Sequence, residues 1–287
     1  MSDAAQAPVE HPKPIVYGVA SALSPMVRRI VCENPSSMTG PGTNTYLVGI
    51  DEIAVIDPGP EDQQHLEAIA GCGGDRIRWI LLTHTHPDHS PGAVALRERT
   101  GAQLLAYGPG PENLPIDGTL GDGDSIEATE YHLRVLHTPG HASDHLCYLL
   151  PEERTLFTGD HIMQGSTVVI APPDGDMTAY LASLERLKQI KPRLRTIAPG
   201  HGHLIENPIE VIDEYIGHRL AREKQVLDAL RTAETTTIPE LVAAIYTDVP
   251  VELHPVAAYS VWAHLRKLRD DGAAVGDSLD GPWSAAA

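Results

Sequence analysis

The chain has 287 residues and a formal net charge of -18, from 39 Asp and Glu against 21 Lys and Arg. This length is sufficient for one large domain with a substantial core and a second small domain. The acidic balance argues against a broad surface for nucleic acid or anionic membrane, although one small basic cleft would be compatible with it.

Cysteine usage and the N-terminal sequence indicate the compartment. The three cysteines are scattered, and none belongs to a CxxC pair, so a reducing compartment is favoured over a disulfide framework. The N-terminus lacks the basic start and apolar core of a signal peptide, and no run approaches membrane-spanning length. We therefore expect a cytoplasmic protein that does not bind membranes.

The first half of the chain mixes strand-like and helical patterns. Residues 1–24 are expected to form an irregular N-terminal segment. Apolar β-rich runs predict strands, and apolar residues at helical spacing predict helices. The expected strands are 27–32, 43–48, 53–56, 77–82 and 103–107, the expected helices are 61–70 and 93–99, and a long turn-rich connection follows at 108–124.

The pattern continues to about residue 221. Strands are expected at 131–137, 145–150, 155–157 and 195–198, with helices at 176–190 and 208–230. Asp176 is the predicted N-cap of the first of these helices. Hairpins mixed with β-α-β steps are typical of sheets covered by helices, so residues 25–221 are predicted to form one catalytic domain.

Residues 222–287 are predicted to form a separate module. Two helices at 237–246 and 254–271, followed by a hairpin at 273–284, suggest a winged-helix-like domain. A winged helix invites a DNA-binding interpretation, but this part has six Lys and Arg against ten Asp and Glu. Packing or homo-oligomerisation is therefore the better prediction, and duplex DNA is not an expected partner.

The stretch THTHPDHSPG, residues 83–92, carries the main chemical signal. It places His84, His86, Asp88 and His89 directly after an apolar strand. Residues two apart in an extended segment point to the same side, so His84 and His86 can bind one cation. Pro87 then turns the chain, so that Asp88 and His89 can face a second cation. The alternative is a polar turn with solvated histidines, but four ligand-type residues within six positions disfavour it.

Three later positions repeat one design, a potential ligand at a strand end beside glycine. They are His141 in HTPGHASDH, Asp160 in LFTGDHIM and His201 in IAPGHGH. Glycine allows a sharp bend and close approach of the backbone. Each position alone has an ordinary explanation as a surface histidine or a turn aspartate. Their coincidence with the first motif strongly favours a functional role for the three positions.

The order HTHPDH, TPGH, GD and PGHG, over about residues 25–205, resembles the metallo-β-lactamase superfamily. The resemblance implies an α/β fold, an αββα sandwich with two metals at one edge of the paired sheets and a small C-terminal winged-helix-like domain. It implies a first metal bound by His84, His86 and His141. A second metal would be bound by Asp88, His89 and His201, and Asp160 would bridge both. Asp57, in VIDPGP, is expected to orient a ligating imidazole.

Further segments resemble a narrower family. SMTGPGTNTYLVG (37–49), TPGHASDH, and PGHG followed by EYIGHRLAREKQVL resemble the lactamase-β-like family that includes a mitochondrial endoribonuclease. The likeness informs fold and site more than substrate, because one fold hosts many chemistries.

The implied ligands suit two zinc ions per chain, with iron or manganese as alternatives. Such a pair lowers the pKa of water to about 7, and a metal-bridging hydroxide would then be the nucleophile. Asp88 would be the catalytic residue that binds the second metal and orients this hydroxide. His145 and His203 lie near ligands in the sequence, but structural hydrogen bonding explains each equally well, and no proton donor is assigned.

These observations predict a dinuclear hydrolase that cleaves an acyl or phosphodiester bond. The substrate would be a small-molecule ester or thioester, or single-stranded RNA as in the closest family, although the acidic composition provides no evident track for RNA. A glyoxalase II-like thioester hydrolase shares the metal motifs but has a different tail. Weak β-lactam turnover is an expected side activity at most. The alternative class is a non-catalytic metal-binding scaffold that acts through its tail, which the complete ligand set disfavours.

Overall fold

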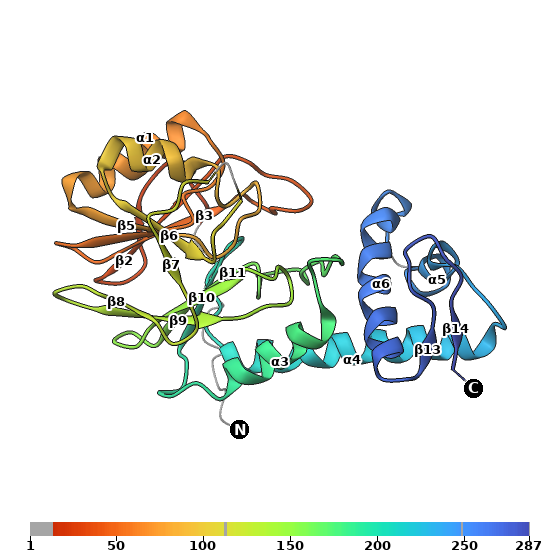
Figure 1. Cartoon of the computed structure of the whole chain (residues 1–287). Helices are drawn as coiled ribbons and strands as arrows, with labels where there is room; N and C mark the ends of the chain where they lie inside the picture. Colours follow the sequence, from red (N-terminus) through yellow and green to blue (C-terminus); the bar gives the residue numbers. More distant parts are fainter. Residues whose placement is uncertain (1–13, 112–113, 248, 287) are drawn as a thin grey trace, which may run out of the picture.

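The computed structural model describes residues 14–111, 114–247 and 249–286. Two β-sheets pack face to face, and a pair of helices covers the outer face of each sheet (Figure 1). Within the segment 1–24 that was expected to be irregular, residues 1–13 lie outside the described part of the chain. Its remainder contains a short strand, β1 (Ser21–Ala22), which was missed because two residues carry no periodic signal.

The first sheet has seven strands in the order in which they occur in the chain. They are β1, β2 (Val27–Val31), β3 (Asn44–Val48), β4 (Ile53–Ile56), β5 (Ile77–Leu81), β6 (Gln103–Tyr107) and β7 (Gly118–Leu120). The outer helices are α1 (Gln63–Gly73) and α2 (Gly92–Thr100), separated from each other by a 3-10 turn, η1 (Gly74–Arg76), and β5. Strand β7 lies within the segment expected to be a connection. Its three residues are too short for a sequence pattern, and parallel pairing with β6 defines it.

The second sheet has five strands in the order β12-β11-β10-β9-β8. They are β8 (Ser125–Glu127), β9 (His132–His137), β10 (Leu146–Leu150), β11 (Thr155–Gly159) and β12 (Thr196–Pro199). Helices α3 (Met177–Lys188) and α4 (Pro208–Thr232) cover it. Asp176 caps α3 as predicted, since its side chain accepts a hydrogen bond from Ala179 N at 2.8 Å.

Mostly aliphatic side chains fill the space between the sheets, with four buried aromatic rings among them. Tyr46 of β3 and Phe157 of β11 are fully buried, with ring centroids 5.1 Å apart. Burial of such large apolar faces is the main force that holds two sheets together.

Strand direction brings several strand ends to one edge of the sandwich. Strands β4 and β5 are parallel, as are β11 and β12, and β9 runs in the same direction as β11 because each is antiparallel to β10. Asn44 joins the two sheets at this edge, donating from its backbone N to Gly200 O at 2.8 Å and from Nδ2 to Pro199 O at 2.9 Å. The segments that carry the candidate ligands therefore converge.

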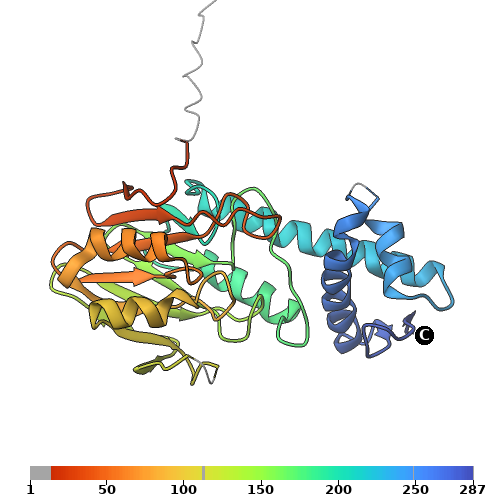
Figure 2. The ribbon, with the colours of Figure 1, turned by 90° about the horizontal axis from the view of Figure 1, so that it is seen from above.

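The C-terminal part forms its own small core around the fully buried Trp283. It consists of α5 (Ile238–Ile245), a 3-10 turn η2 (Val251–Leu253), α6 (His254–Asp270), and a hairpin of β13 (Ala274–Val275) and β14 (Ser284–Ala285). Figure 2 shows this module at the far end of α4, beside the sandwich.

Helix α4 is continuous across the expected domain boundary between residues 221 and 222. Ile212 and Tyr215 pack in the sandwich core, whereas Val226 and Leu230 pack in the tail core. Ala263 of α6 also joins the sandwich core, so the tail contacts the sandwich directly. None of the described helices is both long and apolar enough to span a membrane.

Candidate metal centre

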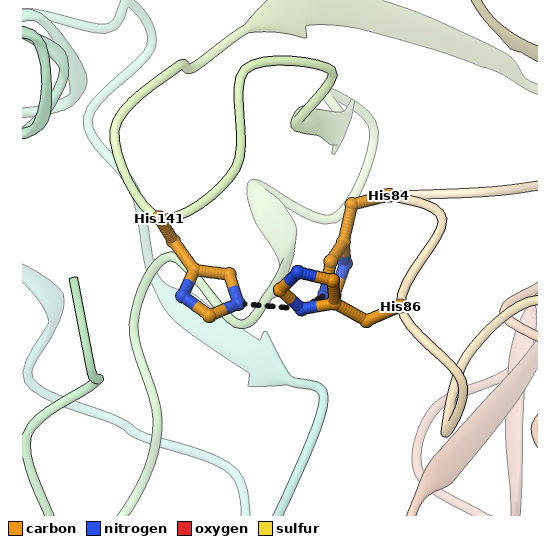
Figure 3. Close-up of side chains that lie close together, drawn as sticks. All are labelled: His84, His86 and His141. Carbon is orange, nitrogen blue, oxygen red and sulfur yellow. Dashed lines mark hydrogen bonds between the residues drawn. The ribbon is translucent and has the colours of Figure 1, made fainter. Parts of the chain in front are cut away.

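Three histidines from two strand ends form the first cluster. His84 and His86 follow β5, and His141 follows β9. His86 Nδ1 lies 3.1 Å from His84 Nε2 and 3.1 Å from His141 Nε2. Figure 3 shows the His86 ring facing His141, with His84 beside it. Nitrogen atoms from three rings thus converge on one point, which is the arrangement that binds a cation.

The second cluster contains Asp88, His89, Asp160 and His201. Asp160 Oδ1 lies 3.3 Å from His89 Nε2 and 3.2 Å from His201 Nε2. Asp88 Oδ2 lies 3.4 Å and 3.1 Å from the same two nitrogens. Two carboxylates and two imidazoles therefore surround a second point.

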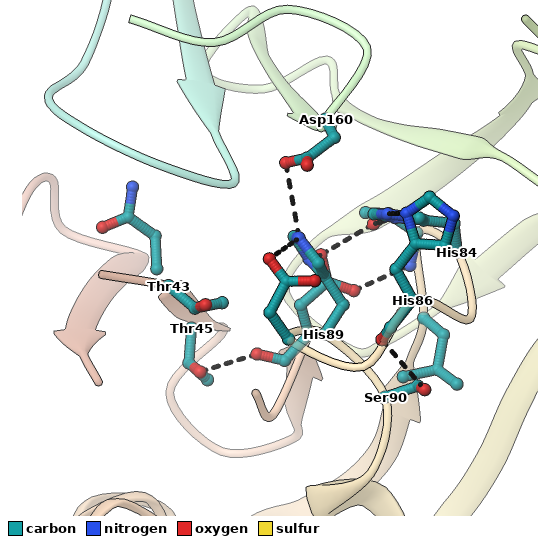
Figure 4. Close-up of polar contacts among 12 residues, drawn as sticks. Thr43, Thr45, His84, His86, His89, Ser90 and Asp160 are labelled. Atoms are coloured by element: carbon teal, nitrogen blue, oxygen red, sulfur yellow. Dashed lines mark hydrogen bonds and ion pairs between the residues drawn. The ribbon is translucent and has the colours of Figure 1, made fainter. Parts of the chain in front are cut away.

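Asp160 lies between the two clusters. Its Oδ1 belongs to the second cluster, while its Oδ2 lies 3.9 Å from His141 Nε2 of the first. Figure 4 shows the carboxylate directed toward His89. The structure thus brings together all seven residues that the sequence singled out, with Asp160 between the two clusters.

Buried polar atoms test whether this site suits metal ions. His89 Nε2, His201 Nε2 and Asp160 Oδ1 are buried, and none has a hydrogen-bond partner among the described residues. Leaving a buried polar atom unpaired costs about 1–3 kcal/mol. One cation in contact with all three atoms would remove this cost. The nitrogen and carboxylate donors fit zinc, iron or manganese.

The pKa shifts agree with a cation site. Burial, followed by repulsion from His89, holds the pKa of His84 well below its usual value, so its ring is neutral and can bind metal. Burial opposes the charged form of Asp160, but the neighbouring His89 and His201 outweigh it and hold its pKa well below the usual range. Burial also opposes the charged form of His89, but the carboxylates of Asp160 and Asp57 outweigh it and hold the pKa well above its usual value. The potential at this point is therefore strongly negative.

Asp57 follows β4 and holds the first motif in place. Its carboxylate accepts hydrogen bonds from Thr83 N and Thr83 Oγ1, both at 2.7 Å, and from His89 Nδ1 at 2.9 Å. Because Nδ1 of His89 is engaged, Nε2 is the atom free to face the second cluster. Asp57 thus lies where the sequence placed an orienting group.

Backbone carbonyls orient two further ligands. His141 Nδ1 donates to Val169 O at 2.8 Å, and His201 Nδ1 donates to Gly42 O at 3.2 Å. Sequence reasoning missed both contacts, because any residue supplies a carbonyl. It also missed Asp144, whose carboxylate accepts hydrogen bonds from Thr85 N and Oγ1. These bonds hold the residue between His84 and His86 in place. The sequence HASDH was the available signal for Asp144.

Three other histidines lie close to the ligands. His145 is fully buried, contacts Thr138 Oγ1 through Nδ1 at 3.0 Å, and stacks on His84 at 5.0 Å between centroids. His161, which sequence reasoning missed, is fully buried, with its ring centroid 5.6 Å from that of His145. His203 is partly exposed, and its backbone N donates to the side chain of Gln164 at 3.4 Å. His145 and His161 are thus packed against the centre, away from solvent.

Two known protein families match this chain. Residues 38–201 match the family described as Metallo-beta-lactamase superfamily, more than half of the chain. This chain belongs to the metallo-β-lactamase superfamily. Residues 237–283 match the Beta-lactamase associated winged helix domain. The metallo-β-lactamase sandwich and the winged-helix tail that the sequence predicted are therefore confirmed.

Similar proteins support the same assignment. A protein named Beta-lactamase-like protein 2 homolog from Drosophila melanogaster is 36% identical over 277 residues, covering 90% of this chain and 92% of the relative. A protein named Atrochrysone carboxyl ACP thioesterase from Aspergillus fumigatus is 33% identical over 251 residues, covering 80% and 76%. A metallo-beta-lactamase family protein from Thermus thermophilus shares the fold, with a TM-score of 0.77, 24% identity and coverage of 92% and 100%. The chain is a metal-dependent hydrolase of this superfamily.

Proposed function

We propose that this metallo-β-lactamase superfamily member hydrolyses small, neutral esters or thioesters, with two divalent cations held by the two clusters. One observation carries the choice of substrate. The segments that form the metal edge contain no lysine or arginine, namely residues 32–43, 57–62, 82–92, 138–145, 160–176 and 199–207. An acyl carbonyl needs no such side chain for recognition, whereas a phosphate backbone does.

Among the described residues, two arginines from elsewhere donate hydrogen bonds to carbonyls of these segments. Arg29 is buried and donates to Gly202 O at 3.0 Å, and Arg219 is buried and donates to Val168 O. Neither guanidinium is exposed to a ligand. This arrangement supports a neutral substrate over single-stranded RNA.

A pocket of about 470 Å³ lies between the segments that follow Asp160 and His201. Met163, Leu204 and Val211 supply apolar surface, and Glu206 and Glu214 supply negative charge; the lining contains no lysine or arginine. The side chain of Gln164 lines this pocket and accepts from His203 N, two residues beyond a candidate ligand. The pocket is suited to a partly apolar acyl group. The relative named as a thioesterase supports this class of substrate.

Bound divalent cations would supply an acidified water and a positive site for a developing oxyanion. The chain's own residues orient the reactants. Burial opposes the charged form of Asp88, but the neighbouring imidazoles of His201 and His89 outweigh it and hold the pKa well below its usual value, so this carboxylate is ionised. Asp88 is also the most exposed carboxylate of the second cluster, with 26% of its side chain accessible. It can therefore orient an attacking water.

Metal content tests the dinuclear arrangement. Because the candidate ligands form one cluster of three and one of four, and Asp160 of the second lies 3.9 Å from His141 of the first, we expect close to two zinc ions per chain after zinc loading and removal of excess metal. Elemental analysis with protein quantified by amino-acid analysis measures the ratio. Binding of no more than one ion would contradict the dinuclear proposal, and parallel loading with iron and manganese would rank the metals.

Substrate preference tests the proposed function. The metal-loaded protein should hydrolyse a short acyl thioester or a p-nitrophenyl ester with kcat/KM at least about a hundredfold above that for bis-p-nitrophenyl phosphate, single-stranded RNA or a β-lactam, roughly 2.7 kcal/mol of discrimination. Faster cleavage of RNA would overturn the choice of substrate. If no substrate class were cleaved while two metals remained bound, a non-catalytic scaffold would be favoured.

A further inference from the structure

Residues 161–170, here called the strap, run without regular secondary structure from one cluster to the other. The strap begins immediately after Asp160, which faces both clusters. Near its end, Val169 O accepts the hydrogen bond from His141 Nδ1 at 2.8 Å. Two residues of the centre therefore depend on the position of the strap, Asp160 through the chain itself and His141 through a hydrogen bond.

Three side chains from α3 and α4 form hydrogen bonds with backbone atoms of the strap. Tyr180 Oη donates to His161 O at 2.8 Å. Tyr215 Oη accepts from Met163 N at 3.0 Å and lies 2.6 Å from Ser166 O, which can accept its proton. Arg219 donates to Val168 O, the carbonyl next to the one that binds His141. The strap is thus fastened at its start, middle and end.

Arg219 is the most unusual of these residues. Its side chain is only 3% exposed, and it forms no ion pair with any described carboxylate. Its guanidinium lies 5.4 Å from the centroid of the Tyr180 ring, and its buried Nε has no hydrogen-bond partner in the described part of the chain. Burying a charge without a counter-ion is costly. A purely structural contact in this place could be made by an apolar side chain at lower cost.

We propose that Arg219 is a positioning residue for the metal centre. By holding the Val168 carbonyl it keeps the neighbouring Val169 carbonyl aimed at His141 Nδ1, so that His141 presents Nε2 to the first cluster. Partners of this kind raise ligand basicity and fix ring orientation. This inference rests on the proposed role of His141 as a metal ligand, and it does not depend on which bond the enzyme cleaves.

The position of Arg219 on α4 also connects the strap to the tail. Tyr215 and Arg219 lie four residues apart, on one face of the helix. Arg222, about one turn further on, instead donates to Ile245 O at 3.2 Å and lies 4.1 Å from the Tyr246 ring centroid. The motif EYIGHRLAREKQVL therefore contains one arginine for the strap and one for the tail, which provides a matched control.

The experiment compares Arg219→Met, Arg219→Lys and Arg222→Met in the full chain. Metal affinity is measured by competition with a chromogenic chelator, and ligand geometry by the absorption spectrum of the cobalt-loaded protein. We expect Arg219→Met to weaken binding of one of the two ions by about tenfold and to change the cobalt spectrum. Arg219→Lys keeps a charge but loses the guanidinium fork, so an intermediate loss is expected. Arg222→Met should stay within about twofold of wild type, because its contacts lie in the tail.

Wild-type metal affinity and cobalt spectrum in folded Arg219→Met would overturn the proposal. An equal loss in Arg222→Met would also overturn it, because the effect would then be general destabilisation. If Arg219→Met does not fold, Arg219→Lys decides: an intermediate loss supports the proposal, and wild-type affinity contradicts it. Loss of affinity in a protein that cleaves no ester would sustain the role of Arg219 while contradicting the proposed substrate.

Discussion

Asp160→Asn is expected to lower turnover of any accepted substrate by at least about a hundredfold, roughly 2.7 kcal/mol in the barrier. The side chain keeps nearly the same volume but loses the negative charge that faces both clusters, where Oδ1 lies 3.2 Å from His201 Nε2 and Oδ2 lies 3.9 Å from His141 Nε2. An amide is a poor bridging ligand. The two cations should therefore separate, or one should be lost, and water activation should fail with them.

The measurement combines turnover, metal content and thermal unfolding on the same preparations. Asp160→Asn should still fold, with a lower Tm at equal free metal because bound metal stabilises the native state by mass action. Asp213→Asn, which removes a surface carboxylate paired with Lys188, is the control and should behave as wild type. Unchanged turnover with two metals retained in Asp160→Asn would remove this residue from the centre.

Asp57→Asn is expected to weaken binding at the second cluster by about tenfold to a hundredfold, the usual effect of removing a partner that orients a ligand. Asp57 is almost completely buried and accepts three hydrogen bonds, from Thr83 N, Thr83 Oγ1 and His89 Nδ1. The amide group of asparagine cannot accept from His89 where its nitrogen replaces Oδ2. A buried donor is then left unpaired, at a cost of about 1–3 kcal/mol in unfolding free energy.

Asparagine is the informative substitution at position 57 because of the backbone. Asp57 has a φ of 52°, in the left-handed region, where asparagine and aspartate are tolerated better than other residues with a side chain. Denaturant unfolding and chelator competition would measure the two effects. Asp144→Asn, which alters support for Thr85 without touching a ligand ring, should have a smaller effect on metal affinity. An equal effect of both variants, or none in Asp57→Asn, would contradict the orienting role of Asp57.

Local signals in the sequence were sufficient for much of the fold. Strand β5 and helix α2 lie where the apolar run at 77–82 and the helical pattern at 93–99 indicated, and the N-cap of α3 is the predicted Asp176. Such elements are encoded by contiguous residues through periodicity and capping. Strands β1, β7 and β8 were missed because each is too short for a pattern and exists only through pairing with a neighbour.

The candidate ligands also divide into those that lie close together in the sequence and those that only folding brings near them. His84, His86, Asp88 and His89 lie within six residues, so the sequence alone determined that they share one corner of the fold. The resemblance to a known family added His141, Asp160 and His201. The distances that put Asp160 between two clusters, by contrast, depend on strand pairing across two sheets.

What only the tertiary structure decided is the environment that holds these ligands. Whether a carbonyl such as that of Val169 meets His141 depends on backbone position, which no residue type encodes. The burial of Arg219 depends on how α3, α4 and the strap pack together, although its position in the helix could be read directly from the sequence. Residue identity determines which groups can bind a cation. Only long-range packing, through sheet pairing and buried hydrogen bonds, determines where those groups meet and which of their atoms face the cation.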